Sequence, residues 1–543
     1  MFLHPQLVDR LLADLGDSLV AFLPELILCG AIVIMLLLRL VSALDRVHLG
    51  WLALAAVLGA LGVSWGQWQG CCFSALPKGA EMFTGLLAYD NFTIFVRLFL
   101  FGFTALVLWL SLLTGIPDRE DSADFNTLLL GSTVGMALMA SANHLMMVFI
   151  AVEMASLPSF ALAGYLKGRR QSSEAALKYV VYGGGSAGIM LYGISLISGK
   201  FGTGYLPDLA QVLPTAVATG FDPVLSLGLV FVLIGIAFKL AAVPFHFWCP
   251  DVFEGAATEV AAFLSVASKG AALALLGRIT LVLNPGLPSQ AVHMAPYLIP
   301  LLAVLAALTA TFGNLAAYAQ TNLKRLLAYS TIAHAGYMMM GLATLTTEGA
   351  SAVLFYLVVY LFMNLGAFAV VAFLRNQTGS EDLSSYGGLI LKAPVMVITL
   401  GVFLLSLLGL PPLGGFVAKL QIFLALVNAG TRYVATGSPG LGYIMYALLV
   451  IGGLNTVFSA VYYIKVLKTM TIDPPPEAAD GKEPTPLPIP VLSSAYAIGL
   501  AVLVTVLGIL WNPLAVASDK GVQQFTLQTT ASVPAPKVAE VQP

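Results

Sequence analysis

The chain contains a long series of apolar segments, most of them about 20 residues in length. A helix of roughly 20 residues spans the hydrocarbon core of a bilayer, and only helices and closed barrels satisfy their backbone groups there. Because 59% of the 543 residues are hydrophobic and only 10% are charged, we predict an all-α polytopic membrane protein. The fourteen expected transmembrane helices lie near residues 18–40, 49–67, 91–114, 126–142, 145–166, 174–198, 223–248, 258–283, 297–319, 323–344, 350–374, 392–428, 441–467 and 490–511.

Two of these segments contain prolines that should break a helix. Pro244 follows Lys239 by five residues, and a proline lacks the backbone N–H and clashes with the preceding turn, so the seventh helix should break and free the carbonyl near Leu240. The sequence GLPPLGG at 409–415 should break the twelfth helix. Broken backbone at membrane depth must line a wet or protein-filled cavity, because lipid cannot satisfy it.

A weak internal repeat divides the chain. The sequence ALAGY at 161–165 recurs as AHAGY at 333–337, and each half has its own broken helix. The apparent unit has five helices, the fourth to eighth against the ninth to thirteenth, and an odd number inverts the second copy, as in transporters with a site at the midplane. The predicted parts are a three-helix segment (1–120), two inverted five-helix repeats (121–290 and 291–470), a flexible Pro-rich linker (471–489), a last helix (490–512) and a flexible tail (513–543).

Basic residues outside the apolar segments are unevenly distributed. Most of them, including Arg169, Lys324 and Arg375, lie in loops after odd-numbered helices. The positive-inside rule therefore makes those loops cytoplasmic and places both termini outside, on the periplasmic side of a bacterial inner membrane. Acidic residues stand where a signal peptide would have its basic region, so we expect no cleavage.

Ionisable residues within apolar segments are the strongest functional signal, since a charge at the bilayer centre costs roughly 2.5 to 3.5 kcal/mol. Glu153 and Lys239 lie in the middle of their segments and could form a coupled pair; a neutral acid bonded to a backbone carbonyl is the alternative for Glu153. Lys269 is surrounded by small residues that leave room for water. Its alternative is a structural ammonium that caps carbonyls of the broken seventh helix.

Three further residues are candidates with stronger alternatives. Lys419 follows its helix break by seven residues and could instead extend toward an interface. His334 titrates near neutrality, although a histidine within a helix is more often a packing residue. Lys178 has Glu174 at the i, i+4 spacing and is as well explained by a surface pair. His246 could bond to freed carbonyls, Lys324 and Arg325 could be topology signals, and Arg97 has no clear role.

The sequence also argues against several kinds of site. It has no Walker motif, dinucleotide-binding glycine turn, catalytic triad spacing or Cys/His metal spacing, so we expect no nucleotide, flavin, metal or iron–sulfur cluster in this chain. The net charge of −2 provides no basic surface for nucleic acid.

Five motifs carry a resemblance to a known family. They are VEMASLPSFALAGY, EAALKYVVYGGGSAGIMLYGISLISG, AFKLAAVPFHFWCPDVFEGAATEVAAFLSVASK, QTNLKRLLAYSTIAHAGYMMMG and LGLPPLGGFVAKL, and they cover most of residues 120–425. The chain resembles the antiporter-like membrane subunits of respiratory complex I, in particular subunit N of bacterial NADH–quinone oxidoreductase. Its long Pro-rich loop, extended tail and adjacent Cys71 and Cys72 depart from the family pattern.

The resemblance implies a proton channel coupled to NADH oxidation and quinone reduction on other subunits. Glu153 and Lys239 would be the coupled pair, Lys269 the central relay, and His334 and Lys419 the path toward the periplasm, with Lys178 as a further relay residue. FMN, iron–sulfur clusters and quinone would be bound by partner subunits. The expected partners are the lipid bilayer, the antiporter-like subunit M and the small subunits K, J and A. A cation/proton antiporter component of the Mrp type and a passive scaffold are the alternatives.

Overall fold

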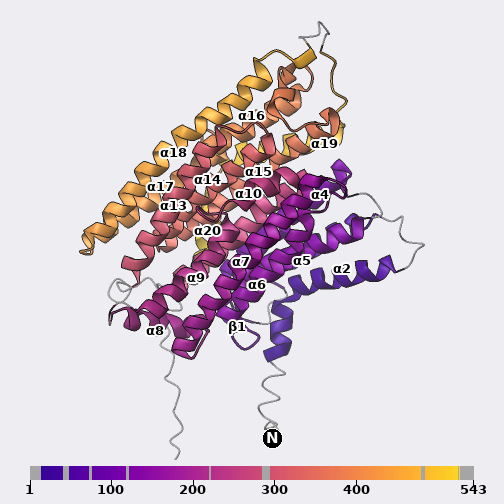
Figure 1. Ribbon diagram of the computed structural model, residues 1–543. Coiled ribbons are helices and arrows are strands. Elements are labelled where there is room, and N and C mark those ends of the chain that lie inside the picture. Colours follow the sequence, from indigo (N-terminus) through magenta and orange to yellow (C-terminus); the bar gives the residue numbers. More distant parts are fainter. Residues whose placement is uncertain are drawn as a thin grey trace, which may run out of the picture.

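The structure, a computed structural model, is helical throughout most of its length (Figure 1). It describes residues 14–40, 48–72, 76–117, 121–218, 220, 222–283, 294–477, 484–523 and 525. The predicted all-α membrane fold is confirmed at this level. The α-helices are α2 (Leu23–Arg39), α3 (Gly50–Gln69), α4 (Asn91–Thr114), α5 (Ser122–Ser141), α6 (Leu145–Ala163), α7 (Arg170–Phe201), α8 (Leu206–Ala218), α9 (Pro223–Leu240), α10 (Trp248–Gly255), α11 (Thr258–Phe263), α12 (Lys269–Leu283), α13 (Ala295–Ala317), α14 (Leu323–Ala343), α15 (Thr347–Thr378), α16 (Pro394–Leu408), α17 (Gly414–Ala435), α18 (Pro439–Thr471), α19 (Val491–Ile509) and α20 (Asn512–Val522).

The two predicted helix breaks are present. The seventh predicted span is divided into α9 and α10, with Pro244 between them, and the twelfth into α16 and α17 around Pro411 and Pro412. The eighth predicted span is also irregular, because a π-helical turn (Leu264–Ser268) separates α11 from α12 immediately before Lys269. The sequence contains no proline there, so this irregularity was not predicted.

Within the described residues, eleven helices are long and apolar enough to cross a membrane. A twelfth would be the pair Asp14–Ala21 and Leu23–Arg39, which is bent by 75° where we expected one continuous span. Helices α5 and α14 do not meet these criteria, and α16 has only 15 residues. The count of fourteen transmembrane helices therefore remains a prediction.

The centre of the bundle is formed by α11, α12 and α15. The apolar window of Thr258–Leu283 is completely buried and that of α15 nearly so, whereas α18 and α19 are mostly exposed. Figure 1 shows α18 along the outer edge of the bundle, where it packs on α13 and α17. Polar side chains on α11, α12 and α15 consequently lie inside the protein rather than against lipid.

Several elements outside the predicted spans correct our expectations. Helix α8 and the antiparallel hairpin of β1 (Ala80–Met82) and β2 (Leu87–Tyr89) lie in segments that we predicted to be loops. Within the predicted tail, α20 packs on α4 and α15 and buries Val522. In the predicted Pro-rich linker, Glu477 pairs with Lys392, and the Leu487 N–H donates to the Lys392 carbonyl at 3.1 Å. The flexibility of both segments stays a prediction. The rest of the tail and residues 478–483 lie outside the described residues.

Candidate functional site

Lys239 lies at the end of α9, beside the first helix break. The backbone leaves the helix at Ala241, which has a positive φ of 54°. The carbonyl of Phe238 accepts from the Ala241 N–H (2.9 Å) and from the indole Nε1 of Trp248 (3.0 Å). Lys239 is 1% exposed, and its Nζ has no hydrogen-bond partner among the described residues. It lies 5.9 Å from the centre of the Tyr179 ring, a contact that partly stabilises an ammonium.

Glu153 approaches Lys239 without touching it. Its carboxylate, on α6, is partly buried and interacts electrostatically with Lys239, but no ion pair joins the two residues. The sequence predicted a coupled pair. The structure places the two residues within electrostatic range of each other without an ion pair, and their coupling stays a prediction. An ammonium without a fixed counter-ion can release its proton without first breaking a salt bridge.

Lys269 is the most centrally placed lysine. Its Nζ donates to Thr331 Oγ1 on α14 and to Cys249 Sγ on α10, the latter at 3.7 Å, and lies 5.6 Å from the Phe253 ring. These contacts differ from the alternative in which Lys269 caps carbonyls of the broken α9, a task that Trp248 performs. Lys269 thus connects the first broken helix to α14.

His334 is held by two tyrosine hydroxyls. Its Nδ1 lies 2.7 Å from the Tyr356 hydroxyl on α15, and its Nε2 lies 3.2 Å from the Tyr463 hydroxyl on α18. Tyr463 in turn lies 2.5 Å from Ser330 Oγ. The ring is therefore part of a hydroxyl network and not an isolated packing residue. Sequence analysis missed these tyrosines, although Tyr356, Tyr360 and Asn364 recur at four-residue spacing on one helix face.

Lys419 lies inside the second break. It is 4% exposed, its Nζ donates to the carbonyl of Leu408 at 2.9 Å, and it lies 4.7 Å from the centre of the Tyr337 ring. A lysine that extended toward an interface would expose its ammonium, so that alternative does not describe this side chain.

These residues form one continuous line of contacts. On one side, the Tyr179 ring beside Lys239 stacks on Trp248 with centroids 4.3 Å apart, and the next residue, Cys249, contacts Lys269. On the other side, Lys269 contacts α14 at Thr331, which is three residues from His334. His334 and Tyr337 then lie 5.9 Å apart, and Tyr337 contacts Lys419.

Lys178 belongs to a different cluster. It pairs with Glu174 (2.7 Å) and Asp251 (2.6 Å), and Arg325 pairs with the same Asp251 (2.6 Å) and with Glu254 (2.8 Å). The Lys178 side chain is 37% exposed. The surface-pair alternative therefore describes its contacts, and among the described residues no hydrogen bond or ion pair joins Lys178 to Lys239.

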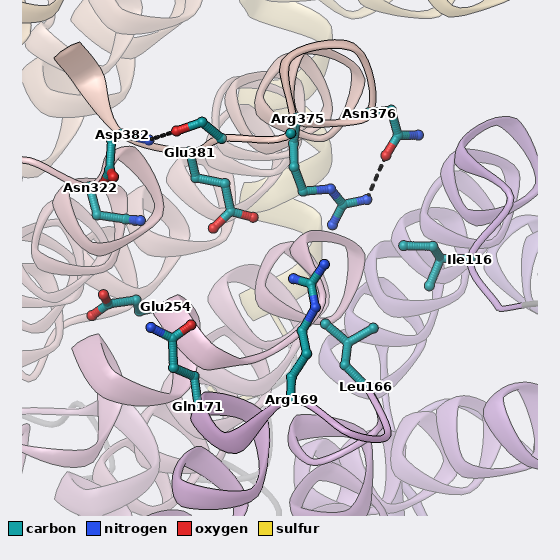
Figure 2. Close-up of a pocket in the computed structure, with 12 residues that line it drawn as sticks. Ile116, Leu166, Arg169, Gln171, Glu254, Asn322, Arg375, Asn376, Glu381 and Asp382 are labelled. Carbon is teal, nitrogen blue, oxygen red and sulfur yellow. Dashed lines mark hydrogen bonds between the residues drawn. The ribbon is translucent and has the colours of Figure 1, made fainter. Parts of the chain in front are cut away.

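A polar cavity of about 460 Å³ opens beside this cluster (Figure 2). Its wall is formed by the loops that follow α6, α13 and α15, together with the end of α10. Arg169, Arg375 and Glu381 extend into a common space in Figure 2. Lys324, which we interpreted as a topology signal at the surface, is 2% exposed and pairs with Glu381 at 3.0 Å.

Buried lysines beside two broken helices define a helical membrane protein of the antiporter-like class. In agreement, residues 142–439 match the family described as NADH:quinone oxidoreductase/Mrp antiporter, TM. Subunit N of NADH-quinone oxidoreductase from Anaeromyxobacter sp. is 38% identical over 93% of this chain and 96% of its own length, and subunit N 2 from Sorangium cellulosum is 40% identical over 92% and 96%. The chain belongs to the NADH-quinone oxidoreductase subunit N family.

Solved structures share the fold. A chain of respiratory complex I from Thermus thermophilus is 32% identical, with a TM-score of 0.71 over 92% of this chain and 100% of that chain. A chain of the Mrp complex from Dietzia sp. has a TM-score of 0.77 over 94% of this chain and 98% of that chain, at 20% identity. The second likeness concerns the fold alone.

Proposed function

We propose that this chain is the proton-translocating subunit N of an NADH–quinone oxidoreductase. The observation that carries the proposal is the series of buried ionisable side chains Lys239, Lys269, His334 and Lys419, with the partly buried Glu153 near its start. Its members are ionisable groups that hydrocarbon would exclude. The chain is similar to two subunit N proteins of NADH-quinone oxidoreductase over nearly its full length. This similarity supports coupling of proton transfer to NADH oxidation and quinone reduction on other subunits.

In the mechanism, protons move along this line in single steps. Glu153 approaches Lys239 closely enough to change the free energy of its ammonium, so a change in the charge or distance of Glu153 shifts the proton toward Lys269. Lys269 passes the proton to the Thr331 hydroxyl and on to His334 with its tyrosine hydroxyls, groups that can both donate and accept. Lys419 receives it at the second break. Water between these groups would complete the steps that exceed hydrogen-bond distance.

The proposal extends to the arrangement in the membrane. Fourteen transmembrane helices in two inverted five-helix repeats, with both termini on the periplasmic side of the bacterial inner membrane, agree with the two broken helices and with the distribution of basic loops. The partners would be subunit M and the small subunits K, J and A. FMN, iron–sulfur clusters and quinone would be bound by other subunits, with no redox site in this chain.

The test is NADH-driven proton uptake by membrane vesicles that contain the assembled complex. Replacement of Lys239 or Lys269 by Ala, or of Glu153 by Gln, should lower the rate at least tenfold, on the order of the loss of a positioned proton carrier. NADH oxidation with an artificial electron acceptor should be unchanged. Lys167→Gln is the matched control, because that lysine is 76% exposed and pairs with Asp121. Normal pumping by Lys239→Ala and Lys269→Ala would favour a passive scaffold.

The Mrp-type antiporter is the second candidate, and the Dietzia structure supports it at the level of the fold. The same vesicles distinguish it. A cation/proton antiporter component would move protons in response to a sodium or potassium gradient without NADH, whereas the proposed subunit would require NADH.

A further inference from the structure

Glu259 is a buried carboxylate that the proposed proton line does not use. It lies in the first turn of α11, ten residues before Lys269, and is 0% exposed. Its Oε1 lies 3.5 Å from Arg375 Nη2, while its Oε2 has no hydrogen-bond partner among the described residues. A buried, unpaired carboxylate oxygen is costly and calls for an explanation.

Glu259 is separated from the polar cavity by a single side chain. Arg375 lines that cavity, is 9% exposed, and reaches inward to Glu259 and to Thr258 Oγ1 (3.1 Å). Glu381, on the same cavity wall, pairs with the buried Lys324. Charged groups thus continue without interruption from the 460 Å³ cavity in Figure 2 to the start of α11.

Further polar groups lie between Glu259 and Lys269 along this helical run and on the facing α15. Ser265, in the π-helical turn, accepts a hydrogen bond from Asn364 Nδ2 at 2.5 Å, and Asn364 Oδ1 is buried with no partner among the described residues. At a rise of 1.5 Å per residue, Ser265 lies about 9 Å from Glu259 and about 6 Å from Lys269. Ser265 therefore lies between Glu259 and Lys269, whose separation is too long for a single proton transfer.

Small residues are frequent along this helical run. Ala257, Ala261, Ala262 and Ala267 all lie between the cavity and Lys269 in the sequence. Buried polar atoms that lack protein partners are usually satisfied by internal water where the site is polar and roomy. A π-turn at this depth is also a frequent feature of functional sites.

We propose that Glu259 is a further proton-carrying residue of this channel, which takes protons from the cavity beside Arg375 and passes them along α11 and α15 toward Lys269. The carboxylate accepts a proton from water in the cavity on Oε2 and becomes a carboxylic acid. It then gives that proton to water or hydroxyl groups near Ser265, from which the neutral amine of Lys269 receives it, and returns to the carboxylate. The inference rests on the proposed function, because Glu259 would deliver protons to the proposed line at Lys269.

The experiment compares Glu259→Gln, Glu259→Asp and Glu254→Gln in membrane vesicles, with proton uptake divided by the amount of assembled complex. Gln keeps the acceptor that faces Arg375 but cannot carry a proton, so the rate should fall at least about tenfold, and Asp should restore more than half of it. Glu254 is the matched control because it lines the same cavity but pairs outward with Arg325 (2.8 Å), and its Gln variant should pump normally.

A purely structural ion pair would lower the amount of assembled complex while leaving the rate per complex unchanged, and this result would overturn the inference. If Glu259→Gln does not assemble, Asn364→Leu provides the same test further inward, since it removes the group beside Ser265 without touching the cavity; normal pumping by this variant would also overturn it. Loss of pumping in Lys269→Ala together with normal pumping in Glu259→Gln would reject the role of Glu259 alone. Normal pumping in Lys269→Ala would reject the proposed function itself.

Discussion

The ammonium of Lys419, on α17, donates a hydrogen bond to the carbonyl of Leu408, the last residue of α16, at 2.9 Å. The last carbonyls of a helix have no partner within it, and at membrane depth no bulk water replaces one. The lysine that we place in the proton line therefore also completes the broken helix, and these two roles can be separated by substitution.

Lys419→Arg should keep the structural role and lose the transport role. Arginine can donate to Leu408 but does not deprotonate in proteins, so the complex should assemble normally and pump at least about tenfold more slowly. Lys419→Met should lose both, because it leaves a buried carbonyl unpaired at a cost of about 1–3 kcal/mol. Vesicle proton uptake and the yield of assembled complex measure the two effects. Pumping at the normal rate by Lys419→Arg would leave Lys419 with a capping role only.

Gly415→Ala should disrupt the packing of α17 against α16 at the second helix break. A Cβ at Gly415 would lie 1.8 Å from the Ser406 carbonyl oxygen, and the Gly415 N–H donates to Ser406 Oγ at 3.0 Å, so α17 could not approach α16 without a shift of the backbone. We expect a loss of at least about 1–3 kcal/mol of stability, seen as a lower Tm of the purified chain in detergent.

Gly453→Ala is the control for this steric argument. Gly453 lies within α18, and a Cβ there meets no atom within 4 Å. Alanine within a helix is more favourable than glycine by roughly 0.5–1 kcal/mol, so Tm should be unchanged or slightly raised. Equal values of Tm for Gly415→Ala and the unsubstituted chain would show that a small shift of the backbone relieves the close contact between the new Cβ and the Ser406 carbonyl.

Asp90 should make the stability depend on pH at acid values. Burial would raise the pKa of its carboxyl, but the two hydrogen bonds from Arg278 (2.9 Å each) and those from Thr93 hold the pKa below its usual 3.8. A depressed pKa in the folded state contributes stability that is present above the unfolded pKa, about 3.9, and is lost as the pH falls through the folded value. Thermal unfolding between pH 3 and pH 7 should show this loss.

Asp90→Asn should remove that pH dependence and lower the stability at pH 7, because Arg278 would remain buried without its counter-ion, at a cost of about 3–5 kcal/mol. Asp121→Asn provides a comparison at an exposed site, since the partner of Asp121 is the exposed Lys167. If Asp90→Asn still lost stability steeply at acid pH, another carboxylate would be the cause of that loss.

Much of the fold was visible in the sequence because its causes are local. Apolar length determines where helices form, and Pro244 and Pro412 end their helices by removing a donor, so both breaks could be predicted. The buried lysines were visible because a charge within an apolar segment is costly wherever it occurs. The π-turn before Lys269, by contrast, lies among ordinary helix-forming residues and depends on tertiary contacts such as that of Asn364 with Ser265.

The contacts that complete the site could not be predicted, because they join residues far apart in the chain. The tyrosines around His334 come from two other helices and look like ordinary aromatic residues in the sequence. Glu259 looks like a carboxylate at the end of a span, and only the fold shows that Arg375, 116 residues away, covers it. Helix α20 was missed because its buried residues, Ser518, Gly521 and Val522, do not form an apolar stripe in the sequence.

Arg97 illustrates the same limit and leads to the last prediction. It is 0% exposed, and its Nε donates to Glu25 Oε1 at 2.6 Å; its Nη1 donates to the carbonyl of Ala21 (3.1 Å), at the bend of the first helix pair. Arg97→Ala should therefore cost about 3–5 kcal/mol, because Glu25 would stay buried without a counter-ion. The double variant Arg97→Met/Glu25→Leu should recover much of this loss, since a pair of apolar side chains leaves no buried charge. Proton uptake per assembled complex should be normal in both variants, because Arg97 lies outside the proton line. Thermal unfolding in detergent together with vesicle uptake checks both points, and a double variant no more stable than Arg97→Ala would contradict the ion-pair explanation.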